Sequence, residues 1–92
     1  MIAVPHVLPD VLRDIIRRQP LTPAKVDFAW RTAVGAAIAR ISTVRLGRDG
    51  TLRVRVPDAR WKQEIDRAGD VIRARLERLL GDDLQRLDID IS

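Results

Sequence analysis

The sequence has no cysteine, very few aromatic residues and no long apolar run. Its 92 residues include no Cys or Tyr, a single His, a single Phe and two Trp. Without cysteine the chain forms neither disulfides nor thiolate metal sites, and the lone His6 has no second ligand at metal-binding spacing. No stretch of about 18 apolar residues is present that could cross a membrane. We therefore expect no metal, no other cofactor and no membrane span.

Catalytic and nucleotide-binding motifs are absent from the sequence as well. It contains no G-x-x-x-x-G-K-[ST] phosphate loop and no G-x-G-x-x-G segment. The two close carboxylate pairs, Asp82-Asp83 and Asp88/Asp90, are interpreted as loop residues after a helix and as the solvated side of a strand. General acid–base chemistry needs a cleft that excludes water, and so short a chain offers little such volume. We therefore predict a binding protein with no catalytic residues.

The net charge of +4 is compatible with binding to nucleic acid or to another anionic surface. All but two of the basic residues are arginines, a bias that a GC-rich genome would also produce. The charge is unevenly distributed, because residues 1–50 hold eight Lys/Arg and four Asp/Glu whereas residues 51–92 hold nine of each. The positive excess therefore lies in the first half of the chain.

Apolar periodicity predicts a short amphipathic helix over residues 9–19. Arg17 and Arg18 in its last turn complement the negative end of the helix dipole, and the proline that follows ends it. We interpret residues 1–20 as this N-terminal helix and residues 21–92 as a single globular unit.

Two longer helices are predicted on either side of a pair of strands. Thr22-Pro23 is an N-cap followed by a first-turn proline, so the second helix is expected to run to about Ile41 with Trp30 in its buried stripe. A third helix is expected to run unbroken over residues 59–80, with Trp61 on its apolar face. Both tryptophans are therefore predicted to anchor the core.

Residues 43–57 change to a period of two and predict a β-hairpin whose turn contains Asp49-Gly50. Residues 86–92 alternate again and predict a short third strand. Because a β-α-β connection crosses over with a fixed hand, the last strand is expected to lie parallel to the second. The predicted fold is α+β with the order α-α-β-β-α-β, in which helices pack on one face of a three-stranded mixed sheet.

The predicted hairpin carries four arginines, Arg45, Arg48, Arg53 and Arg55, against a single acid. Alternation places the side chains of Arg45, Arg53 and Arg55 on the solvent face. If the last strand pairs with the second, Asp88 and Asp90 share that face and neutralise part of the charge. Arg45 and Arg48, which lie farther from the last strand, would then be the cations with fewer acidic neighbours. Further phosphate contacts are expected from Lys25 and from the Arg17-Arg18 pair.

Aromatic side chains are not available to stack on bases. Both tryptophans are assigned to the core, so the sheet face offers no stacking platform and an RRM-like mode is disfavoured. Any nucleic-acid contact should therefore be directed mostly at phosphates, sensitive to salt and weakly specific for sequence.

Several segments together resemble the DciA family of bacterial replicative-helicase loaders: Trp30-x-x-x-Val34-Gly35-x-x-Ile38-Ala39, Gly50-x-Leu52-x-Val54-x-Val56, Trp61-x-x-Glu64-Ile65 and the helix end Leu76/Leu80-Gly81. The resemblance implies a KH-like α-β-β-α-β domain that associates with the hexameric replicative helicase and binds single-stranded or tailed DNA without hydrolysing nucleotide. It also implies a bacterial, cytoplasmic and nucleoid-associated protein.

One feature departs from nucleic-acid-binding KH domains, which clamp phosphates with a Gly-x-x-Gly loop between two helices. Gly69 is the only glycine in residues 58–80, within a helix expected to be unbroken.

Our leading hypothesis is a non-enzymatic replication accessory protein with an apolar patch that binds a protein partner. The first helix is a candidate for that patch. One alternative is a protein-interaction module without a DNA role, such as a homodimer formed through the first helix. The other is a KH-like RNA-binding protein.

Overall fold

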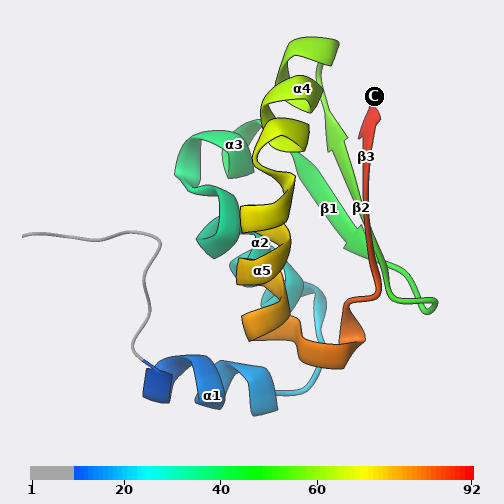
Figure 1. The fold of residues 1–92 in the computed structure, drawn as a ribbon. Helices are drawn as coiled ribbons and strands as arrows, with labels where there is room; N and C mark the ends of the chain where they lie inside the picture. Colours follow the sequence, from blue (N-terminus) through cyan, green and yellow to red (C-terminus); the bar gives the residue numbers. More distant parts are fainter. Residues whose placement is uncertain (1–9) are drawn as a thin grey trace, which may run out of the picture.

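The computed structural model describes residues 10–92 (Figure 1). Within this range the chain forms five α-helices, a 3₁₀ turn and three strands, in the order α1 (Asp10–Arg18), α2 (Pro23–Val34), α3 (Ala36–Ile41), β1 (Thr43–Leu46), β2 (Thr51–Val56), α4 (Ala59–Arg67), α5 (Gly69–Leu80), η1 (Gly81–Asp83) and β3 (Arg86–Ile91). The fold is α+β, as predicted. His6 and the expected first residue of the N-terminal helix, Pro9, lie outside the described residues.

The strands form one mixed sheet in the order β1-β2-β3. β1 and β2 pair antiparallel as a hairpin, and β3 pairs parallel with β2. The predicted topology is confirmed, because the connection through α4 and α5 returns the chain to the free edge of β2. Figure 1 shows the helices stacked on one side of the sheet, so that the described elements leave its other face uncovered.

The core lies between the helices and the covered face of the sheet. Along β2 the apolar residues are buried while Arg53 and Arg55 are exposed, as the alternation predicts. Trp30 is enclosed in the core, and its indole Nε1–H donates to Ser42 Oγ over 2.8 Å. Trp61 is half-buried and packs against the core from α4. The predicted anchoring role is therefore confirmed in full for Trp30 and in part for Trp61.

The expectation of a single helix from Thr22 to Ile41 is wrong, because Gly35 divides it into α2 and α3. Gly35 has φ 89° and ψ 167°, a backbone conformation that is essentially restricted to glycine. The carbonyl end of α2 is satisfied from outside the helix, since the Arg75 guanidinium of α5 donates to Ala33 O over 3.0 Å. Apolar periodicity continues through this break and gives no sign of it.

We expect Gly35→Ala to lower the free energy of unfolding by about 1–3 kcal/mol, because alanine is strained at this φ. Gly69→Ala is the matched control, since Gly69 has a negative φ and a Cβ atom built there meets nothing within 4 Å. This control should be neutral or stabilising by up to about 1 kcal/mol. Urea unfolding followed by far-UV circular dichroism measures both changes, and equal stabilities of the two variants would contradict the strain at Gly35.

The expectation of an unbroken helix over residues 59–80 is also wrong. Ala68 leaves helical geometry at φ −97° and ψ 13° and separates α4 from α5, and Gly69, a poor helix former, follows it. The bend allows α4 to pack against β2 and β3 while α5 packs against α1 and α2. The position of the break therefore follows from packing on two different neighbours.

A buried lysine holds α1 to the rest of the domain. Lys25 is 7% exposed, and its Nζ donates to Arg17 O over 3.0 Å and to Gln19 O over 2.9 Å. These are carbonyl groups at the C-terminal end of α1, which have no partner within the helix. The Thr22 hydroxyl accepts from the Lys25 backbone N–H over 3.2 Å, which confirms the predicted N-cap of α2.

Candidate nucleic-acid interface

Arginines dominate the uncovered face of the sheet. Arg45 of β1 and Arg53 and Arg55 of β2 all lie on this face and are exposed. Arg45 and Arg53 are directly opposite each other in the antiparallel register. Like charges at opposed positions destabilise a sheet, so this pair is unfavourable for folding. The same arrangement creates a local concentration of positive charge that suits an anionic ligand.

Arg48 extends this group of cations into the hairpin turn between β1 and β2, where it is exposed. The four hairpin arginines predicted from the sequence therefore belong to one hairpin and lie close together along the chain. We call Arg45, Arg48, Arg53 and Arg55 the hairpin arginines.

The register also places carboxylates on this face, as expected. Asp88 lies opposite Arg53 and Asp90 lies opposite Arg55 in the parallel pairing of β2 with β3. Neither pair approaches within the 4.0 Å that defines an ion pair. Among residues 10–92, the one ion pair made by a hairpin arginine joins Arg53 Nη2 to Asp49 Oδ2 over 3.8 Å. Both of these side chains are exposed, so the contact holds the guanidinium weakly.

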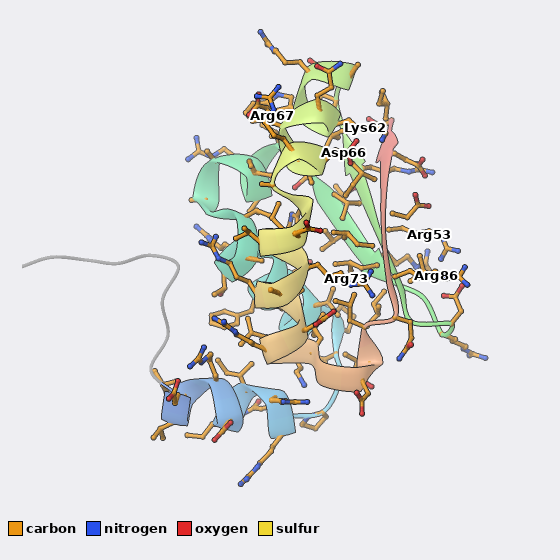
Figure 2. The ribbon with its side chains drawn as sticks, in the orientation of Figure 1. Arg53, Lys62, Asp66, Arg67, Arg73 and Arg86 are labelled. Carbon is orange, nitrogen blue, oxygen red and sulfur yellow. The ribbon has the colours of Figure 1, made fainter. Side chains whose placement is uncertain are left out.

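Arg86 is a further cation of this face that the sequence reasoning missed. It occupies the first position of β3, opposite Thr51, and is exposed. Figure 2 shows Arg86 and Arg53 projecting from the same side of the sheet, away from the helices. The signal was present in the sequence, because Arg86 has the same alternation parity as Asp88 and Asp90.

The turn that carries Arg48 is fixed by its own hydrogen bonds. The Thr51 backbone N–H donates to Asp49 Oδ1 over 3.1 Å, and the Gly50 N–H donates to Gly47 O over 3.0 Å. The hydrogen bond from Thr51 lowers the pKa of the Asp49 carboxyl, and Arg53 acts in the same direction. A lowered pKa means that the ionised form is favoured by folding, so this contribution is present at neutral pH and is lost as the pH falls through the lowered value.

The hairpin turn is also tied to the start of β3. Gly50 O accepts from Gln85 N–H over 2.8 Å and from Arg86 N–H over 3.1 Å. The carbonyl group of Gln85 accepts a hydrogen bond from Arg73 of α5 over 2.9 Å, and Arg73 also pairs with Glu77 over 3.0 Å. Arg86 is therefore placed beside the hairpin by backbone bonds and not by its own side chain.

The other predicted phosphate-binding residues lie elsewhere. Lys25 is buried under the C-terminal end of α1 and is not available to a phosphate group in this structure. Arg17 packs over Gly81 at the end of α5, where a Cβ atom on the glycine would lie 2.8 Å from Arg17 Nε. Arg18 is exposed on α1, which contacts α5 and lies at the opposite end of the helical layer from α4 (Figure 1). Within residues 10–92, no hydrogen bond or ion pair joins any of these three residues to the hairpin.

Two of the three cations of α4 are paired, in contrast to those of the hairpin. Lys62 Nζ lies 2.9 Å from Asp66 Oδ2, and Arg67 lies 3.3 Å from Glu64 (Figure 2). Such pairs at i, i+3 and i, i+4 spacing neutralise a solvated helix face. The hairpin therefore carries more unpaired positive charge than α4 does.

Within residues 10–92, no cluster of three side chains suited to metal binding is found. In the same part of the chain, no helix combines the length and the apolar character that crossing a membrane requires.

The comparison with known proteins gives one positive finding. The family model described as "Dna[CI] antecedent, DciA" matches residues 3–89, which is nearly the whole chain. No curated protein matches the sequence. The match agrees with the arrangement of the two tryptophans, the hairpin and the terminal strand. The chain therefore belongs to the DciA family, a family of accessory proteins associated with helicase loading in DNA replication.

Proposed function

We propose that this chain is a non-enzymatic replication accessory protein that binds the phosphates of single-stranded or tailed DNA and associates with the replicative helicase in the bacterial cytoplasm. The membership of the DciA family supports the helicase as partner. The opposition of Arg45 and Arg53 on an uncovered sheet face supports the DNA contact and is the observation on which it chiefly rests. The hairpin arginines, joined by Arg86, form the proposed surface.

The chemistry of this surface favours contacts to the phosphate backbone over contacts to bases. Guanidinium groups match phosphate oxygens with two parallel hydrogen bonds. Among the described strands, no aromatic side chain lies on the uncovered face, so bases find nothing on which to stack. Binding should therefore tolerate any base sequence and weaken steeply as salt is added.

We expect the double variant Arg45→Ala/Arg48→Ala to weaken binding to single-stranded DNA and to flatten its salt dependence. These two arginines have no ion pair in the described structure, so their loss removes phosphate contacts without releasing a carboxylate. The slope of log K against log salt should fall in magnitude by about 1.4, or roughly 0.7 for each lost contact. Fluorescence anisotropy with a labelled oligonucleotide across a salt series measures this slope.

The control variant Arg40→Ala/Arg78→Ala removes the same charge from exposed positions on α3 and α5. Its slope should remain close to that of the native chain, because long-range charge acts weakly beyond a screening length of about 8–10 Å. If both double variants lose the same amount of slope, the effect is one of net charge, and the hairpin is not the binding surface. Binding by the native chain that does not depend on salt would exclude phosphate recognition altogether.

The proposed helicase partnership has a separate test. The purified chain, immobilised and exposed to bacterial extract, should retain the replicative helicase, identified by mass spectrometry. Retention in the presence of nuclease would show that the contact is between proteins and is not bridged by DNA. Failure to retain the helicase at low salt would contradict the partnership while leaving the DNA contact untouched.

A further inference from the structure

The apolar residues of α1 are turned mostly outward. Of its four apolar side chains only Ile16 packs against the core. Val11, Leu12 and Ile15 are 68%, 45% and 49% exposed. The side of α1 that meets α5 instead carries Arg17, which lies over Gly81. An amphipathic helix that packs through its polar side leaves its apolar side free for another surface.

A groove continues this apolar side onto α2. It lies between the C-terminal half of α1 and the first turns of α2, has a volume of about 370 Å³, and is lined by Ile16, Gln19, Pro20, Thr22, Ala24, Lys25 and Phe28. Phe28 is 43% exposed, although it is the only phenylalanine of the chain. Helical spacing places Leu12 and Ile16 next to each other on α1, so the outward apolar strip and the groove form one surface. We call Val11, Leu12, Ile15, Ile16 and Phe28 the α1 face.

The charges along α1 make this face complementary to itself. The acids Asp10 and Asp14 lie in the first half of the helix, and the bases Arg17 and Arg18 lie in its last turn. Asp10 pairs with Arg13, whereas Asp14 and Arg18 take part in no ion pair within residues 10–92. When two such helices pack antiparallel, the acidic half of each lies beside the basic end of the other.

We propose that the α1 face is a two-fold interface with a second copy of this chain, in which two α1 helices pack antiparallel. The two-fold axis passes near Ile15, so that Val11 and Leu12 of each copy approach the groove beside Phe28 of the other, and Asp14 lies beside Arg18 of the second copy. An isologous contact of this kind uses the same patch twice and closes without leaving a free face. The inference does not depend on DNA binding, because the hairpin arginines lie on the sheet and not on α1.

The first test is the mass of the native chain in solution. Light scattering after size exclusion should show the mass rising with concentration from 10.4 kDa towards twice that value. Ile15→Glu should raise the dimer dissociation constant by at least roughly tenfold, because it places a charge at the apolar centre of the interface. Val71→Glu is the matched control, since Val71 is 53% exposed on α5 and lies outside the α1 face; it should dimerise like the native chain.

The second test uses charge reversal at Asp14 and Arg18, which take part in no ion pair within residues 10–92. Asp14→Arg alone and Arg18→Asp alone should each weaken self-association, because each places like charges together across the interface. Mixing the two variants should restore it as a heterodimer, detectable by native mass spectrometry, because opposite charges then meet at both ends. Circular dichroism of each variant checks that the fold is retained, as expected for exposed positions.

Two outcomes would overturn this inference. One is a native chain that stays monomeric at the highest concentration measured; if Ile15→Glu then abolishes retention of the helicase, the α1 face belongs to that partner instead. The other is a dimer that Ile15→Glu leaves intact or whose charge-reversed variants fail to recover on mixing. Both are distinguishable from a failure of DNA binding, which is measured with the hairpin variants and with short oligonucleotides.

Discussion

Replacing Trp30 with alanine should lower the free energy of unfolding by about 3–5 kcal/mol, which is enough to unfold a marginal domain of this size. Trp30 is 2% exposed and belongs to the group of largest fully buried side chains that hold α2 to the sheet. Its removal leaves a cavity that the surrounding side chains fill only partly. It also withdraws the Nε1–H that Ser42 Oγ accepts over 2.8 Å at the end of α3.

Two further substitutions separate the parts of this effect. Trp30→Phe keeps most of the apolar contact but loses the hydrogen bond to Ser42, and should lower the free energy of unfolding by about 1–2 kcal/mol. Trp61→Ala removes the half-buried ring of α4 and should also lower it by about 1–2 kcal/mol. Urea unfolding is monitored by circular dichroism, because these variants remove the tryptophan whose fluorescence would otherwise report unfolding. If Trp61→Ala destabilised the fold as much as Trp30→Ala, burial would not be the cause.

Replacing Gly50 with alanine should lower the free energy of unfolding by roughly 2–5 kcal/mol, the combined effect of backbone strain and overpacking. Gly50 has φ +82°, and a Cβ atom there would lie 2.5 Å from Gln85 Cγ and 3.2 Å from Asp83 O. The contact on Asp83 O is with backbone, so it is not relieved by turning a side chain. The chain segment before β3 would have to move away from the turn.

The Gly50 substitution should also affect the proposed DNA surface. Gly50 O accepts hydrogen bonds from the backbone of Gln85 and Arg86, so displacement of this junction moves Arg86 away from the hairpin arginines. Where the variant remains folded, we expect weaker binding to single-stranded DNA than the native chain shows. Gly47→Ala is the matched control within the same turn. Its φ is not positive, and its Cβ atom would meet only side-chain atoms within 3 Å, Arg53 Nη1 and Asp49 Oδ1, so a smaller loss of about 1 kcal/mol is expected from displacing the Asp49 carboxylate that accepts the Thr51 N–H. Equal effects at the two glycines would contradict the role given to the Gly50 junction.

The uncovered sheet face illustrates a conflict between stability and binding. A sheet selected for stability alone would place opposite charges, or β-branched residues, at the opposed positions that Arg45 and Arg53 occupy. Asp88 and Asp90 of β3 lie opposite arginines of β2, but neither forms an ion pair with them. The positive charge is therefore retained where it is least useful to the fold.

Local patterns were sufficient to predict much of the fold. The period of two in residues 43–57 and the Asp49-Gly50 turn predicted the hairpin, and Gly50 adopts the positive φ that this turn requires. The capping residue Thr22 was also predicted, and it accepts the Lys25 backbone N–H over 3.2 Å. Such signals lie within a few residues of the structure that they specify, so sequence alone reveals them.

The sequence determined the hairpin and the arginine-rich side of β1 and β2, because alternation fixes which side chains share a face. It also determined the parallel third strand, because a β-α-β connection crosses over with a fixed hand. Only the tertiary structure decided where the helices break: at Ala68 two segments pack on different neighbours, and at Gly35 α2 ends where Arg75 of α5 binds its Ala33 carbonyl. It also decided the fate of individual cations. Lys25 is withdrawn to bind the carbonyl groups of α1, whereas Arg86 is added to the hairpin by backbone bonds to Gly50. Both contacts join residues from different elements, so residue spacing did not predict them, although alternation already placed Arg86 on the open face of the sheet.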